Sequence, residues 1–138
     1  MSRIVVDTDI ASYIFNWHST AQRYVGSLRG SELILAFASI AEMRMRAMDE
    51  GWGLRRRNLL EQFMRSFGAA YPDDALCTAW AALRARARDS GRSLSPQDAW
   101  IAATALRLDA PLATNNRIDF EHIKKLRLLP PLAYRAEA

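Results

Sequence analysis

Residues 4–10 read IVVDTDI, and this stretch decides how the rest of the chain is interpreted. Three β-branched residues in succession, at positions 4–6, are typical of a short strand that is buried on both faces. The strand would end at Asp7, where a carboxylate that directly follows a buried run needs a partner. A short amphipathic helix is expected to follow, and Asp9 offers an ordinary N-cap for it.

Outward from this stretch, strands and helices alternate along the chain. Further strands are expected at residues 33–37, 68–71 and 111–113, with a last edge strand near residues 126–129. Helices are expected between them, at about residues 20–28, 39–50, 59–67 and 73–89, and from residue 95 onward. This alternation predicts the α/β class, with a small central parallel sheet flanked by helices on both sides. The length of 138 residues suits one domain that spans residues 1–138.

The composition of the chain indicates which cellular compartment and which kinds of binding partner to expect. The chain has 19 Lys plus Arg against 15 Asp plus Glu, a formal charge of +4 that favours polyanions as partners. Cys77 is the only cysteine, so no internal disulfide is possible and a reducing compartment is expected. The longest apolar run, residues 33–38, is far shorter than the roughly 20 residues that span a bilayer. We therefore expect a cytoplasmic protein without a membrane partner.

Acidic and amide side chains recur at the junctions where strands pass into helices. Asp7 ends the first strand, Glu42 lies in ASIAEM, Asp98 lies in SPQDAWIAA, and ATNNRIDF supplies Asn116 and Asp119. If the strands run parallel, these junctions collect at one edge of the sheet, where open α/β folds bind ligands. Carboxylates crowded there repel one another unless a cation or a proton joins them. The pattern therefore predicts a metal-dependent hydrolase.

Each of these residues also has a structural alternative. Glu42 lies three residues after Ser39, which is the spacing of a helix capping box, and Asp98 lies three residues after another serine. Acidic groups in a first helical turn also gain about 0.3–1 kcal/mol from the helix dipole. Asp119 could cap a short helix after the last strand. The functional hypothesis therefore depends on the convergence of all these positions.

The motifs VVDTDIASYI, ASIAEM, DAWIAATAL and TNNRIDF, in this order and spacing, resemble those of PIN-domain ribonucleases. Within that group they are most similar to the VapC toxins of bacterial toxin–antitoxin pairs, and the resemblance covers nearly the whole chain. It implies a parallel sheet with helices on both sides and hydrolysis of RNA to 3′-hydroxyl and 5′-phosphate ends. It also implies Mg²⁺ or Mn²⁺ as the cofactor, a homodimer, and a cognate antitoxin whose tail lies across the active-site groove.

Carried over position by position, the resemblance makes Asp7, Glu42 and Asp98 the three core acidic residues. Asp7 and Asp98 would be the main metal ligands, and Glu42 would act through water or assist in proton removal. Asn116 matches the family's fourth polar position and supplies a neutral oxygen, with Asp119 three residues later. An all-oxygen set of this kind selects Mg²⁺ or Mn²⁺ over Zn²⁺.

Residues outside the motifs have less specific interpretations. His18 and His122 are expected at the surface rather than as ligands. Arg44 and Arg46 follow Glu42, and most of the chain's arginines are expected on solvated faces, with a few near the acidic edge that contact phosphates.

The sequence is also compatible with two other functions. A haloacid-dehalogenase-type phosphatase would use Asp7 as its nucleophile, but it needs a downstream lysine, and the chain has lysine only at positions 124 and 125. An RNA- or protein-binding module that has lost full metal binding is the second alternative. Asn116, which adds no charge to the site, is the feature that favours it.

Overall fold

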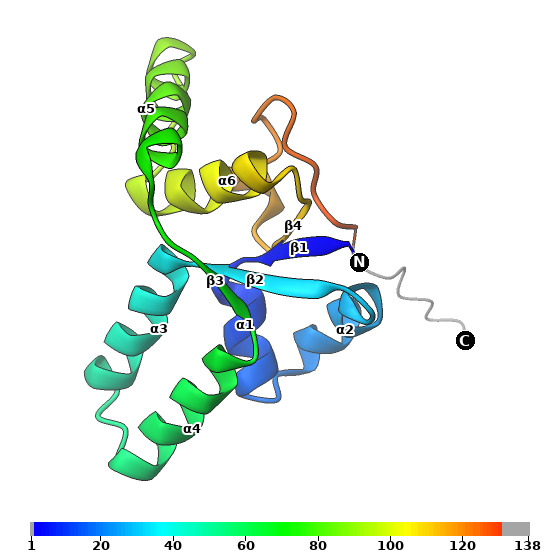
Figure 1. Ribbon diagram of the computed structural model, residues 1–138, viewed down its shortest axis with the longest axis vertical. Helices are drawn as coiled ribbons and strands as arrows, with labels where there is room; N and C mark the ends of the chain where they lie inside the picture. The colour runs from blue at the N-terminus through cyan, green and yellow to red at the C-terminus, as the bar shows by residue number, and fades with distance from the viewer. Residues whose placement is uncertain (1, 131–138) are drawn as a thin grey trace.

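A computed structural model describes residues 2–130 as a four-stranded sheet between two layers of helices (Figure 1). The sheet has the order β3-β2-β1-β4, and every neighbouring pair is parallel. Its strands are β1 (Arg3–Val6), β2 (Glu32–Ala36), β3 (Gly68–Ala70) and β4 (Leu112–Ala113). The predicted α/β class and central parallel sheet are confirmed.

Two helical layers cover the two faces of the sheet. One layer contains α1 (Thr8–Phe15), α2 (Gln22–Leu28), α3 (Phe37–Asp49) and α4 (Leu54–Arg65). The other layer contains α5 (Asp74–Asp89) and α6 (Pro96–Leu108), which lie above the sheet in Figure 1. Two single-turn 3-10 helices, η1 (Ser19–Ala21) and η2 (Arg117–Asp119), complete the described helices.

Alternate residues of the central strands belong to separate hydrophobic cores. Val5 of β1 and Ile34 of β2 pack in the core that contains α5 and α6. Their neighbours Val6 and Leu35 pack in the core that contains α1 to α4. Because successive side chains of a strand point to opposite faces, the buried run at residues 4–6 serves both cores at once. This double burial fixes where β1 ends, and therefore where the carboxylate of Asp7 lies.

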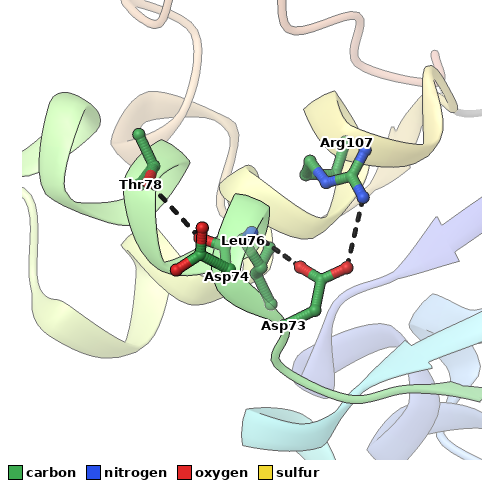
Figure 2. A network of polar contacts seen from close by, with 5 residues as sticks. All are labelled: Asp73, Asp74, Leu76, Thr78 and Arg107. Carbon is green, nitrogen blue, oxygen red and sulfur yellow. Dashed lines mark hydrogen bonds and ion pairs between the residues drawn. The ribbon is translucent and has the colours of Figure 1, made fainter.

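The start of α5 is held by a polar network that also reaches α6 (Figure 2). The carboxylate of Asp73, the N-cap residue, accepts a hydrogen bond from the backbone N–H of Leu76 at 2.7 Å. Its second oxygen accepts one from Arg107 of α6 at 3.2 Å. One turn further on, the Thr78 hydroxyl donates to the Asp74 carbonyl at 3.3 Å. The helix predicted at about residues 73–89 is confirmed, and its N-cap aspartate has a cationic partner.

The start of α3 differs from the prediction. The helix begins at Phe37 rather than Ser39, and its N-cap residue, Ala36, has no side-chain hydrogen bond. The Ser39 side chain is fully buried and instead accepts a hydrogen bond from the Thr8 hydroxyl at 2.8 Å. The capping box predicted for Ser39 and Glu42 is therefore wrong, because a contact between two helices uses the serine.

The last predicted strand is reduced to a single parallel bridge between Leu112 and Leu128. The Leu112 N–H donates to the Arg127 carbonyl at 2.9 Å, and the Leu129 N–H donates to the Leu112 carbonyl at 2.8 Å. β4 is only two residues long, so it offers its outer neighbour little backbone to pair with.

No helix within residues 2–130 is long and apolar enough to cross a membrane.

Candidate active site

Asp7 stands at the carboxyl end of β1 and is the N-cap of α1. Its carboxylate accepts hydrogen bonds from the Thr8 N–H at 2.8 Å and from the Thr114 hydroxyl at 2.6 Å. The residue is only 6% exposed. Burial, followed by the charge of Asp9, raises the pKa of Asp7 to about 7, although both hydrogen bonds act in the opposite direction. Asp7 is therefore held in a position where its ionised form is disfavoured.

Asp9, expected as the N-cap of α1, lies instead in the first turn of that helix. One of its oxygens accepts a hydrogen bond from the Ile10 N–H at 2.6 Å, and the other accepts one from the Asn115 N–H at 3.1 Å. Burial first, and then the charge of Glu42, raises the pKa of Asp9 against these hydrogen bonds. Sequence reasoning missed Asp9 as a site residue, although its spacing of two from Asp7 was the available signal.

Glu42 lies in the second turn of α3, where it faces the beginning of α6. The side-chain amide of Gln97 donates to a Glu42 oxygen at 2.9 Å and to the Ala38 carbonyl at the same distance. Gln97 therefore ties α3 to α6 and fixes one oxygen of Glu42. No motif singled out Gln97, because its role arises from the crossing of two helices that are distant in sequence.

Asp98 lies in the first turn of α6, after the predicted serine cap. Ser95 is the N-cap and accepts a hydrogen bond from the Asp98 N–H at 3.0 Å, as the SPQD motif predicted. Burial is the largest cause that raises the pKa of the Asp98 carboxyl, followed by the charge of Asp119. The charges of Glu42 and Asp9 act in the same direction. The carboxylate of Asp98 is thus close enough to several others to be affected by each of them.

Asn116 and Asp119 lie in the loop that follows β4. The side-chain amide of Asn116 donates a short hydrogen bond to Asp119, and the Asn116 N–H donates to the Thr114 hydroxyl at 3.0 Å. Asp119 is the last residue of η2, so the expected helix cap at this position is wrong. The sequence motifs gave Thr114 no role in the site, yet its hydroxyl joins this loop to Asp7.

The structure therefore gathers five acidic side chains at the carboxyl edge of the sheet, and we call them the carboxylate cluster: Asp7, Asp9, Glu42, Asp98 and Asp119. The four ion pairs within residues 2–130 all use other carboxylates, so no Lys or Arg of the described chain neutralises the cluster. Oxygen ligands of this kind suit a hard divalent cation. Within the same residues, however, no three acidic, His or Cys side chains already converge as a complete metal cage. The carboxylate oxygens of the cluster are thus suitable ligands for a cation, but their side chains do not already surround a single metal position.

The arginines beside Glu42 in sequence have structural partners elsewhere. Arg44 forms a bidentate pair with Glu61 of α4, at 3.0 and 2.8 Å, and Arg46 donates to the Ser12 hydroxyl at 2.8 Å. Both side chains therefore join helices in this fold, and the phosphate contacts expected of a few arginines stay a prediction. His18 is exposed, as expected, whereas His122 is partly buried.

The fold and the order of the motifs are matched by a known family. The PIN domain matches residues 4–126 of the chain. This chain belongs to the PIN domain family. Ribonuclease VapC1 of Haemophilus influenzae strain R2866 is 26% identical over 125 residues, which cover 89% of this chain and 93% of the relative. The resemblance drawn from the sequence motifs is thereby confirmed.

Solved structures of the same family superpose over most of the chain. VapBC2 from Rickettsia felis, bound to a promoter DNA fragment, has a TM-score of 0.81 at 20% identity, covering 91% of this chain and 96% of that one. VapBC-1 from nontypeable Haemophilus influenzae has a TM-score of 0.77 at 25% identity, with the same coverage. These similarities show that the same fold covers 91% of the chain.

Proposed function

We propose that this chain is a metal-dependent endoribonuclease, the toxin of a VapBC-like toxin–antitoxin pair, that hydrolyses RNA phosphodiester bonds. The observation that carries the proposal is the carboxylate cluster, in which one buried and four partly buried acidic groups lie together without an ion pair to any Lys or Arg of residues 2–130. A site built for stability alone would gain from a Lys or Arg partner. Membership of the PIN domain family and relatives named ribonuclease VapC1 support the same function.

Asp7 and Asp98 are the proposed ligands of a Mg²⁺ or Mn²⁺ ion. When bound, the cation would lower the pKa of a water molecule and neutralise charge on the phosphoryl oxygens. Thr114 holds Asp7 in position through its 2.6 Å hydrogen bond. Asp119 and the neutral amide of Asn116, joined by their own hydrogen bond, complete the polar wall of the site.

Glu42 is the proposed acceptor of the proton from the attacking water. One of its oxygens is already fixed by Gln97, which leaves the second available for this role. The water oxygen would form a bond to phosphorus while the bond to the 3′ oxygen breaks. The departing 3′ oxygen would take a proton from solvent, and Glu42 would return the water proton to solvent, so that the products would be a 3′-hydroxyl and a 5′-phosphate.

We further propose that a cognate antitoxin binds an apolar groove between α1, α2 and α4. The groove encloses about 1170 Å³, and Trp17 at its rim is 93% exposed. Leu59 of α4 is 49% exposed, and Phe15 lies on the opposite wall. An apolar surface of this size on a protein in water calls for a partner. Solved VapBC complexes with the same fold support an antitoxin as that partner.

Exposed apolar side chains on α3 support a second assembly. Met45 is 57% exposed and Met48 is 64% exposed, and we propose that a second copy of the chain packs against α3 in a homodimer. Multi-angle light scattering of the purified chain tests this proposal.

We place the single PIN domain, residues 1–138, in the cytoplasm, where its RNA substrate is found.

The ribonuclease proposal is tested by incubating the purified, antitoxin-free protein with total cellular RNA in Mg²⁺ or Mn²⁺ and then in chelator. We expect discrete fragments that disappear both in chelator and with the Asp7→Asn variant. Cleavage that persists with purified Asp7→Asn protein would overturn the assignment.

A non-catalytic RNA- or protein-binding module is the second candidate, and two observations favour it. Asn116 adds no charge to the site, and the described residues form no complete metal cage. Absence of cleavage with either metal, from folded and antitoxin-free protein, would support this module. The phosphatase alternative loses its support, because the family matched over residues 4–126 is the PIN domain.

A further inference from the structure

We propose that a second cavity, at the far end of α6 from Asp98, binds a nucleotide of single-stranded RNA away from the scissile phosphate, an inference that rests on the proposed ribonuclease function. The cavity encloses about 780 Å³ between the second half of α5, the end of α6 and the segment after η2. In Figure 1 that segment is drawn in orange beside α6. Asp98 and Leu106, at the two ends, are eight residues apart, or about 12 Å along the helix axis.

The rim of this cavity is basic. Arg86, Arg92, Lys124 and Lys125 line it, and the last two are the only lysines in the chain. All four residues are exposed, and none of them forms an ion pair within residues 2–130. Exposed cations from three separate segments therefore converge on one hollow. Such an arrangement attracts phosphate groups.

The two acidic residues that line the cavity do not cancel this charge, because each already has a partner outside the lining. Asp89 pairs with Arg88 at 3.3 Å, and Asp109 pairs with Arg127 at 3.4 Å. These exposed pairs contribute little to stability, but they balance the acidic charges locally. The positive charge of the rim is left for a ligand.

The floor of the cavity is apolar, which distinguishes it from an ordinary basic surface. It is formed by buried or partly buried side chains, namely Leu83, Ala87, Leu94, Leu106 and Ile123. An apolar floor under a cationic rim fits the face of a base with its phosphate at the edge. A base stacked inside a duplex could not enter such a hollow, so the ligand is single-stranded.

His122 adds a polar group to the wall of the cavity. Its Nε2 is buried and has no hydrogen-bond partner within residues 2–130. Buried polar atoms of proteins nearly always have a hydrogen-bond partner. This imidazole nitrogen is therefore free to bond to a ligand, provided that the side chains covering it move slightly. A base edge or a ribose hydroxyl would supply the missing partner. The cavity thus offers cationic, apolar and hydrogen-bonding surfaces together.

The test compares the Lys124→Gln/Lys125→Gln variant with a matched control, Arg29→Gln/Arg65→Gln, which removes two exposed charges away from the cavity. The dissociation constant of a fluorescein-labelled single-stranded RNA is measured by anisotropy in chelator, over a range of salt concentrations. If both ammonium groups contact phosphates, the lysine variant loses about 25-fold in affinity at about 0.1 M salt, and its salt slope falls by about 1.4. The control keeps the wild-type affinity and slope.

Photocrosslinking provides a second measurement that does not depend on a substitution. RNA that contains 4-thiouridine is crosslinked to the wild-type protein, and the modified peptide is identified by mass spectrometry. A crosslink in residues 122–125 supports the cavity. Equal affinities and slopes in the two variants, with crosslinks only near the carboxylate cluster, would overturn it. Cleavage of total RNA by the wild type, measured in parallel, separates this outcome from failure of the ribonuclease proposal.

Discussion

Two aspartates of this protein cap helices and yet have opposite environments. Asp7 at the start of α1 is buried, has only uncharged hydrogen-bond donors, and has its pKa raised to about 7 by burial. Asp73 at the start of α5 is exposed (Figure 2). The pKa of Asp73 is lowered by the Leu76 N–H and then by Arg107. Asp73 thus stabilises α5, because a cation lies beside its carboxylate. Asp7, at the carboxyl edge of the sheet, is held where its ionised form is disfavoured.

This contrast separates a structural carboxylate, Asp73, from a candidate functional one, Asp7. Asp73 contributes stability because its ionised form is favoured in the fold. Asp7 weakens the metal-free fold at neutral pH, and the proposed cation would reverse this effect. Such a perturbed group in a cluster of like charges marks a candidate functional site.

The largest expected effect is on RNA cleavage. The Asp7→Asn variant should lose activity by at least about 10³-fold, equivalent to about 4 kcal/mol, because it removes a proposed metal ligand. The matched Asp73→Asn variant should cleave at the wild-type rate. Initial rates on the same labelled RNA in Mn²⁺ test the pair, with circular dichroism as a check of folding. Equal rates in the two variants would contradict the functional difference between Asp7 and Asp73.

The next effect is on stability as a function of pH in the metal-free protein. Because the pKa of Asp7 rises from 3.8 to about 7 on folding, the folded state binds more protons between these values, and stability falls as pH rises through this range. The loss is at most about 4 kcal/mol, and Asp7→Asn should remove it. Urea denaturation at several pH values in chelator measures the dependence.

Asp73 provides the opposite sign for comparison. Its pKa is lowered on folding, so its contribution to stability is present above the ordinary pKa of Asp and is lost as pH falls through the lowered value. Asp73→Asn should therefore destabilise the protein about equally at all pH values above this range. A wild-type stability that rises toward neutral pH in chelator would contradict the assignment for Asp7.

The third prediction concerns the cation itself. Mn²⁺ at about 100 times its dissociation constant should stabilise the wild-type protein by about 2.7 kcal/mol. Asp7→Asn and Asp98→Asn should lose this stabilisation, whereas Asp73→Asn should keep it. Thermal unfolding with and without Mn²⁺ measures the difference. An equal shift in all four proteins would point to a site elsewhere.

The smallest expected effect comes from Thr114→Val, which keeps the shape of the side chain and removes the hydroxyl that donates to Asp7 at 2.6 Å. We expect about a 10-fold loss of activity, because groups that orient a metal ligand typically act on this scale. The hydroxyl lowers the pKa of Asp7, so the pH dependence of stability in chelator should move to higher pH. An unchanged pH dependence would show that Thr114 does not position Asp7.

The sequence predicted the parallel sheet and its carboxyl edge because both follow from local patterns. The run at residues 4–6 is buried on both faces, and the SPQD motif starts α6 at Ser95, as expected. The start of α3 was mispredicted because Ser39 bonds to Thr8 of another helix, a contact that no local pattern records.

The site was predicted less completely than the fold. Asp7, Glu42, Asp98 and Asp119 were identified from their positions at strand and helix junctions. Gln97 and Thr114 were missed because each acts across elements that are distant in the chain. The basic cavity was missed for the same reason, since its cations come from three segments that only the fold brings together.

The most direct test of the proposed metal site is anomalous diffraction from crystals of the purified chain soaked in Mn²⁺. We expect a manganese peak at the carboxyl edge of the sheet, bonded to carboxylate oxygens of Asp7 and Asp98. A soaked crystal that shows no peak there, or a peak only at exposed carboxylates such as Asp73, would contradict it.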